Sequence, residues 1–187
     1  MEAIQYRGGS LFGYLAELFE KKGVRGLLVG GYAINAYHIQ RMTFDIDFMV
    51  TSEDFNKIKH DLFVSGYSVF QQTEAFVQLR SDEPGLRDID FLLGDGATVD
   101  ALAKQGKTIQ IAGKNFMVPS ALHLIAMKLH SLGSNERREF KDLPDIIQLF
   151  ATNGIDPQSE ENMHLFRKYN AGNYYEKVVE AVKKNTK

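Results

Sequence analysis

The fold is decided by the stretch Leu27–Val50, LLVGGYAINAYHIQRMTFDIDFMV. In it, the glycine pair Gly30-Gly31 comes after an apolar run and leads directly into a helix-like segment, residues 32–38. Such a pair between a strand and a helix exposes backbone N–H groups at the positive end of the helix, where no Cβ keeps a phosphate away. A tight turn that needs positive φ uses the same residues and explains most isolated Gly-Gly pairs. The pair therefore becomes informative only together with the residues on its C-terminal side.

Two aspartates, Asp45 and Asp47, stand inside the second apolar run of this stretch. Strand alternation over residues 43–50 predicts both carboxylates on one face and Phe44, Ile46 and Phe48 on the other. Like charges on one strand face repel each other, and a divalent cation would stabilise them. A half-exposed strand with a solvated polar face explains the pair equally well. A second acidic strand is needed to separate these interpretations.

That second strand is predicted at residues 87–93, RDIDFLL, where Asp88 and Asp90 again share one face. If the two strands are neighbours, three or four carboxylates converge, although Asp88 could instead form an ion pair with Arg87. Carboxylate oxygens suit Mg²⁺ or Mn²⁺. A carboxylate cluster beside a phosphate-binding turn is what metal-assisted phosphoryl or nucleotidyl transfer requires.

The composition is that of an ordinary globular protein. The 187 residues are 44% hydrophobic and 25% charged, with a net charge of -2 and no cysteine. The charge balance provides no global attraction for nucleic acid or an anionic membrane, and the absence of cysteine excludes disulfides and thiolate metal sites. No run reaches the eighteen or so apolar residues of a membrane span, and the first ten residues contain no apolar signal-like region. We therefore expect a cytoplasmic protein that does not associate with membranes.

The remaining pattern predicts an α+β fold. We expect a mixed β-sheet flanked by helices over residues 1–118 and a helical C-terminal region over residues 119–187, packed together as one compact unit. Residues 133–142, GSNERREFKD, read as a polar link between two helices. Helices are predicted at 10–22, 32–38, 52–66, 98–104, 120–132, 141–152, 160–169 and 174–184, and strands at 27–29, 43–50, 67–70, 75–80, 87–93, 107–112 and 115–118.

The order of these motifs resembles the active-site signature of the DNA polymerase beta-like nucleotidyltransferase superfamily. Within it, the chain is most similar to the bacterial AbiEii-type proteins, the toxin side of abortive-infection toxin–antitoxin pairs, and their uncharacterised relatives. Those families continue with a helix bearing Ser-x-x-x-Leu and a lysine, and then with a basic-Asp-x-x-Asp motif. The positions that carry the resemblance are Gly30, Gly31, Arg41, Thr43, Asp45, Ile46, Asp47, Asp90, Ser120, Leu124, Lys128, Lys141, Asp142 and Asp145.

The resemblance implies a role for several of these residues. Asp45, Asp47 and Asp90 would be the catalytic metal ligands, with Asp90 preferred over Asp88 because it precedes an apolar run. The residues implied in nucleotide binding are Gly30, Gly31, Thr43, Lys128 and Asp142, where Thr43 is the nearest hydroxyl to a turn that carries Gly-Ser in many relatives.

Simpler explanations exist for the last two residues. Lys128 lies on an otherwise apolar helix, where a lysine usually extends its ammonium to solvent. Asp142 precedes Leu143-Pro144 and could be only a helix N-cap. The histidines have no metal-like spacing, which predicts surface or core roles for them; these are His123, His130 and His164.

The sequence thus predicts a Mg²⁺- or Mn²⁺-dependent nucleotidyltransferase that moves a nucleoside monophosphate from an NTP to an acceptor hydroxyl. An inactive member of the fold that binds a nucleotide or a protein is the alternative. The toxin resemblance adds tRNA or a protein as acceptor classes and an antitoxin as a partner. RNA binding would require a basic patch, for which Arg137, Arg138 and Lys141 form the available cluster.

Overall fold

The computed structural model describes residues 3–185, and these form two compact units. The first unit contains residues 3–33 and 42–119, and the second contains residues 34–41 and 120–185. The short segment 34–41 therefore groups with the C-terminal helices, although it lies within the strand-rich half of the sequence. No helix within 3–185 is long and apolar enough to cross a bilayer.

The first unit is built on one mixed sheet of seven strands in the order β3-β4-β5-β2-β1-β7-β6. The pairs β2/β5 and β1/β7 are parallel, and the other neighbours are antiparallel. The strands are β1 (Leu27–Leu28), β2 (Ile46–Thr51), β3 (Ser68–Gln72), β4 (Phe76–Arg80), β5 (Ile89–Gly94), β6 (Lys107–Ile111) and β7 (Lys114–Val118). The two acidic segments of the sequence thus belong to adjacent central strands.

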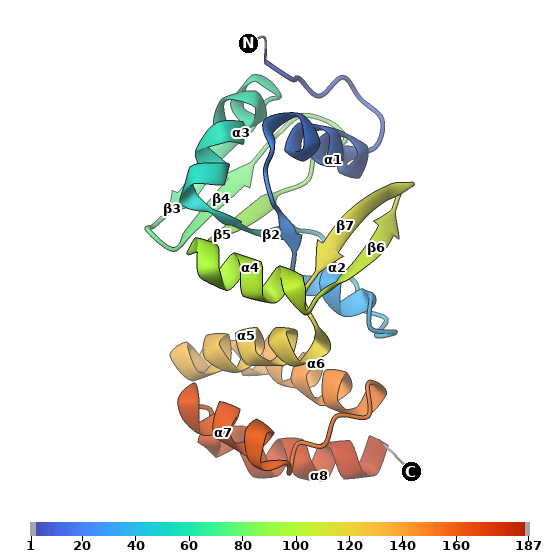
Figure 1. Ribbon diagram of the computed structural model, residues 1–187, viewed down its shortest axis with the longest axis vertical. Coiled ribbons are helices and arrows are strands. Elements are labelled where there is room, and N and C mark those ends of the chain that lie inside the picture. Colours follow the sequence, from blue (N-terminus) through green and yellow to red (C-terminus); the bar gives the residue numbers. More distant parts are fainter. Residues whose placement is uncertain (1–2, 186–187) are drawn as a thin grey trace. The chain divides into compact units, whose positions relative to one another are not determined.

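Helices cover both faces of this sheet. On one side lie α1 (Leu11–Lys22) and α3 (Ser52–Val64), and on the other lies α4 (Gly96–Lys104) (Figure 1). Phe48 of β2 and Phe91 of β5 are fully buried under α1 and α3, with ring centroids 5.0 Å from Phe19 and 5.2 Å from Phe55, respectively. Because side chains alternate along a strand, the acidic residues of β2 and β5 lie on the face opposite this aromatic core.

Helix starts in this unit follow the capping rules. The side chains of Ser10 and Asp95 accept backbone N–H groups at the starts of α1 and α4. The predicted start of α3 at residue 52 is correct, but Ser52 is not its cap, because β2 runs into α3 without a loop. Thr51, the last residue of β2, accepts the N–H of Asp54 at 3.0 Å instead.

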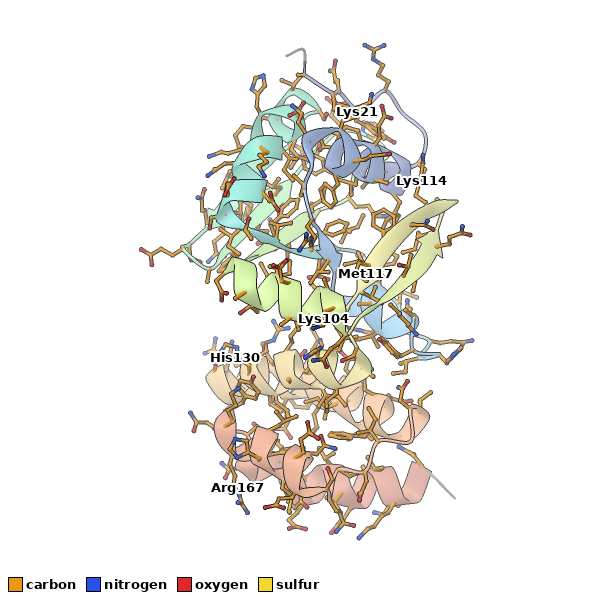
Figure 2. All side chains as sticks on the ribbon, viewed as in Figure 1. Lys21, Lys104, Lys114, Met117, His130 and Arg167 are labelled. Carbon is orange, nitrogen blue, oxygen red and sulfur yellow. The ribbon has the colours of Figure 1, made fainter. Side chains whose placement is uncertain are left out.

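The second unit contains the segment 34–41 and, within residues 120–185, four α-helices with two short 3₁₀ segments between them. Its core contains fully buried residues from every α-helix, including the Phe150 and Phe166 rings, which stack with centroids 6.2 Å apart. Charged residues such as Arg167 point outward, as does Lys21 in the first unit (Figure 2). The elements are α5 (Ala121–Ser134), η1 (Glu136–Arg138), α6 (Glu139–Thr152), α7 (Glu160–Lys168), η2 (Gly172–Tyr174) and α8 (Tyr175–Asn185).

Three local predictions differ from the structure. Phe44 was expected on the buried face with Ile46, but β2 begins only at Ile46 and the Phe44 side chain is 72% exposed. The helix predicted over residues 32–38 is α2 (Gly30–Asn35), which starts at the glycine pair and ends before a turn in which His38 has φ 61°. The supposed polar link at 133–142 also contains η1 and the first turn of α6.

Candidate functional site

The register of β2 and β5 places two of the candidate metal ligands side by side. Asp47 and Asp90 are directly paired across these parallel strands, and neighbouring strands lie about 4.8 Å apart. The Ile46 N–H donates to the Asp88 carbonyl at 3.0 Å, which extends the pairing toward Asp45. The two acidic strands are therefore neighbours, which was the condition for their carboxylates to converge. Asp47 and Asp90 lie on the same face of the sheet.

The glycine pair makes room for residues of this same acidic face. Gly30 has φ +60°, and a Cβ at this position would overlap the Asp47 carboxylate. A Cβ on Gly31 would lie 2.6 Å from the Thr43 hydroxyl. The Val29 N–H also donates to the Asp47 carbonyl at 2.9 Å, which fixes the strand beside the turn. The turn thus lies directly against the acidic strand. Glycine is needed at both positions because a side chain there would collide with Asp47 or Thr43, which the sequence alone did not reveal.

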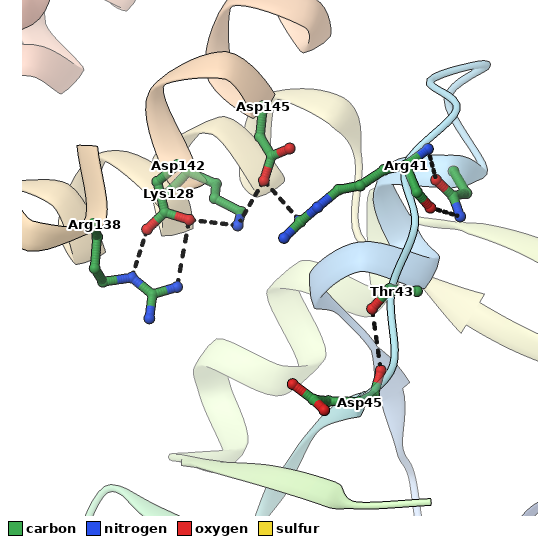
Figure 3. Close-up of polar contacts among 8 residues, drawn as sticks. Arg41, Thr43, Asp45, Lys128, Arg138, Asp142 and Asp145 are labelled. Atoms are coloured by element: carbon green, nitrogen blue, oxygen red, sulfur yellow. Dashed lines mark hydrogen bonds and ion pairs between the residues drawn. The ribbon is translucent and has the colours of Figure 1, made fainter. Parts of the chain in front are cut away.

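Asp45 lies in a bend immediately before β2 and is partly exposed. The Thr43 hydroxyl donates to the Asp45 carbonyl at 3.3 Å (Figure 3). Thr43 is therefore positioned between the glycine turn and the first aspartate. This bond orients the bend that carries Asp45.

The two acids of the β5 region have different surroundings. The Asp88 carboxylate pairs with Arg80 Nε at 3.2 Å, and Arg87 donates to the Tyr32 hydroxyl at 2.6 Å. The pairing of Asp88 with Arg87 suggested by the sequence is therefore wrong. Asp90 instead accepts a hydrogen bond from Gln78 Nε2 on β4 at 3.2 Å. Gln78 was missed by the sequence analysis, although a polar residue between Val77 and Leu79 signals a strand position on the acidic face.

The donors of the acidic face fit Mg²⁺ by chemical type. All are carboxylates, the ligands that hard divalent cations prefer, and Asp47 and Asp90 occupy paired positions on one face. Within residues 3–185, however, no three histidine, aspartate or glutamate side chains are gathered closely enough to hold a metal ion. The arrangement provides two adjacent acidic positions, Asp47 and Asp90. A third acid, Asp45, lies two residues before Asp47 in the chain.

The second unit contains a separate network of buried charges. Lys128 is only 9% exposed, and its ammonium lies 2.6 Å from Asp142 Oδ1 and 2.9 Å from Asp145 Oδ2. Arg138 Nε pairs with Asp142 at 2.6 Å, and Arg41 pairs with Asp145 at 2.7 Å (Figure 3). Three cations thus stabilise two carboxylates that are almost entirely removed from water.

This network overturns both simple explanations from the sequence. The Lys128 ammonium does not extend to solvent, and Asp142 lies inside the first turn of α6 and is not its N-cap. Burial tends to raise the pKa of Asp142, but the hydrogen bonds and charges of Arg138 and Lys128 outweigh it and hold that pKa below its usual value. The role expected for Lys128 and Asp142 in nucleotide binding stays a prediction.

The same network identifies structural roles that the sequence analysis did not assign. Arg41 and Asp145 were part of the quoted motifs but had no function attached to them. Arg138 was counted with a basic patch for RNA, whereas its side chain is held by Asp142. The available signal was the helical spacing of Arg138, Asp142 and Asp145, which puts them on one face of a helix.

Replacing Gly30 by alanine is expected to lower the free energy of unfolding by about 2 kcal/mol or more, because a Cβ costs about 1–2 kcal/mol at this φ and also collides with Asp47. Gly13→Ala is the matched control. Gly13 lies within α1, and the nearest atom to its added Cβ would be Ser10 Cβ at 3.5 Å. This control should be neutral or stabilising. Urea denaturation followed by circular dichroism measures both, and equal stabilities would contradict the proposed close approach.

Comparison with known proteins identifies the fold. No protein-family model matches this sequence, and no curated protein matches it significantly. Among solved structures, ANT(2")-Ia in complex with adenylyl-2"-tobramycin has a TM-score of 0.64 at 17% identity and covers 86% of this chain and 95% of its own. A nucleotidyltransferase-like antigenic protein from Paracoccidioides brasiliensis has a TM-score of 0.57 at 18% identity, with coverages of 90% and 88%.

A third match is the lincosamide antibiotic adenylyltransferase LnuA with lincomycin bound, with a TM-score of 0.54 at 19% identity and coverages of 75% and 95%. These likenesses show that the chain has the nucleotidyltransferase fold. The predicted α+β class, with a mixed sheet, flanking helices and a helical C-terminal part, is therefore confirmed.

Proposed function

We propose that this protein is a metal-dependent nucleotidyltransferase that moves a nucleoside monophosphate from an NTP to an acceptor hydroxyl and releases pyrophosphate. The observation that carries the proposal is the direct pairing of Asp47 with Asp90 beside the Gly30 turn, in a chain with the nucleotidyltransferase fold. Like charges at paired positions of adjacent strands repel each other, and a divalent cation would stabilise the pair.

The chemistry assigns a task to each group on this face. The backbone N–H groups of the glycine turn would bind the triphosphate, and Asp45, Asp47 and Asp90 would hold Mg²⁺ or Mn²⁺. The ion, when bound, supplies charge stabilisation to the transferring phosphoryl group. The acceptor oxygen forms a bond to the α-phosphorus while the bond to the bridging oxygen breaks, and pyrophosphate leaves. Asp90, oriented by Gln78, would take the proton of the acceptor hydroxyl.

A small hydroxylated molecule is the first acceptor class to test. The solved structures with this fold include one with a bound adenylylated tobramycin and one with bound lincomycin. The resemblance to AbiEii-type toxins suggests instead tRNA or a protein as acceptor and an antitoxin as partner. For RNA the available patch is smaller than the sequence indicated, because the Arg138 side chain pairs with Asp142.

The second candidate is an inactive member of the fold that binds a nucleotide. It is favoured by the observation that no three potential ligands within residues 3–185 are gathered into a metal-binding cluster. Calorimetry with each NTP and Mn²⁺, combined with a pyrophosphate assay over a panel of hydroxylated acceptors and tRNA, separates the two. We expect NTP binding that depends on the metal, with pyrophosphate released. Binding without pyrophosphate release for any acceptor would support the inactive binder, and the absence of NTP binding both with and without the metal would reject both.

A further inference from the structure

The second unit contains an open pocket that takes no part in the proposed nucleotidyl transfer. Its volume is about 710 Å³, within the range of about 300–1,000 Å³ that small-molecule sites occupy. Its walls are the segment His38–Arg41 and one face of η1 and α6, on which Arg137, Phe140, Lys141 and Gln148 recur at helical spacing. All of these residues belong to the same unit.

The pocket has an excess of positive charge. Its single carboxylate, Asp145, is 7% exposed and is already held by Lys128 and Arg41. Arg137 and Lys141 are exposed, and no acidic side chain within residues 3–185 forms an ion pair with either of them. Two cations without an internal partner therefore face the same solvent-filled space, and an anion would bind them.

An aromatic ring stands between these two cations in the sequence. Phe140 is 94% exposed, more than any other large apolar side chain within residues 3–185. An exposed phenylalanine forgoes the burial free energy that a covered ring gains. A flat ligand stacked on this ring would recover part of that free energy, as bases do when they stack on aromatic side chains.

The wall opposite α6 is fixed in place. The Asn35 side chain closes the segment by donating to the Arg41 carbonyl at 3.0 Å and accepting the Arg41 N–H at 2.9 Å. Tyr37 and Ile39 are buried, at 8% and 7% exposed, so the segment does not project freely into solvent. The pocket is therefore largely preformed, which lowers the entropic cost of binding.

We propose that this pocket binds an organic anion that carries a flat ring system, of the nucleoside monophosphate class. The ring stacks on Phe140, and the anionic group pairs with Arg137 and Lys141. The site requires neither the acids of the first unit nor a metal ion. Its ligand can therefore be tested without assuming that the chain catalyses nucleotidyl transfer.

The experiment is a titration of the full ¹⁵N-labelled chain with AMP, adenosine and inorganic phosphate in the absence of divalent cations. AMP is expected to shift the backbone signals of residues 38–41 and 137–148. Adenosine lacks the anion and phosphate lacks the ring, so each should bind at least about ten-fold more weakly, the factor that about 1.4 kcal/mol represents. Phosphate or adenosine binding as tightly as AMP, or AMP shifts confined to the glycine turn and acidic strands, would overturn the proposal.

Variants test the two halves of the ligand separately. Phe140→Ala should weaken AMP binding about ten-fold, and its matched control is Phe63→Ala on α3, where Lys59 Nζ lies 5.6 Å from the ring centroid. The double variant Arg137→Gln/Lys141→Gln should weaken AMP binding and flatten its dependence on salt. Unchanged AMP affinity in Phe140→Ala or in the double variant overturns the site, whereas the proposed transferase is tested separately, by metal-dependent NTP binding and pyrophosphate release in the wild type.

Discussion

Replacing Asp47 by asparagine is expected to reduce metal-dependent NTP turnover by at least about a thousand-fold, because it removes one charge of the pair that would hold the metal ion. The amide has nearly the same shape as the carboxylate, so it fits the space left by Gly30, which has no Cβ. Folding should be preserved, since the β2–β5 pairing and the Val29–Asp47 backbone bond do not involve the Asp47 side chain. Pyrophosphate release measures the turnover, and circular dichroism confirms the fold.

Asp90→Asn and Asp88→Asn form the matched pair for this result. Asp90 is paired with Asp47 in the sheet register, so its substitution should abolish turnover as well. Asp88 pairs with Arg80, and Asp88→Asn should change turnover by no more than a few-fold. Wild-type turnover in Asp47→Asn would contradict the catalytic assignment. Loss of turnover in Asp88→Asn but not in Asp90→Asn would show that Asp88 is the third acid in place of Asp90. The rest of the proposal would be unaffected.

The backbone elements were largely predictable because they follow local patterns. Alternation at residues 88–91 followed by an apolar run predicts β5, and Ser10 and Gly23 delimit α1 by capping. The sequence could not show that the two acidic strands are neighbours; it could show only that their carboxylates would converge if they were. Pairing between segments some forty residues apart is decided by the whole sheet, and no residue within either strand encodes it.

The remaining features depend on contacts distant in the sequence. Phe44 continues the alternation of β2, yet it is exposed because the strand starts two residues later. Lys128 looks like a surface lysine on an apolar helix until Asp142 and Asp145 are brought against it from α6. Burial of a charge is decided by its partners, and these come from another element of the fold.

Replacing Lys128 by methionine is expected to lower the free energy of unfolding by about 3–5 kcal/mol, because it removes a cation that two buried carboxylates share. Methionine retains the length and apolar stem of lysine, so lost packing contributes little. Thermal and urea denaturation measure the change. Lys141→Met is the matched control, since Lys141 is exposed on the neighbouring α6 and forms no ion pair within the described residues 3–185.

The pH dependence distinguishes lost charge compensation from lost packing. Arg138 and Lys128 outweigh the effect of burial and lower the pKa of Asp142 in the folded protein. The ionised carboxylate therefore stabilises the fold above the unfolded pKa of about 3.9, and this contribution is lost as the pH falls through the lower, folded pKa. The stability difference between wild type and Lys128→Met should consequently shrink as the pH falls below about 4. A difference that stays constant from neutral to acidic pH would show that Lys128 contributes mainly by packing and that its ion pairs stabilise little.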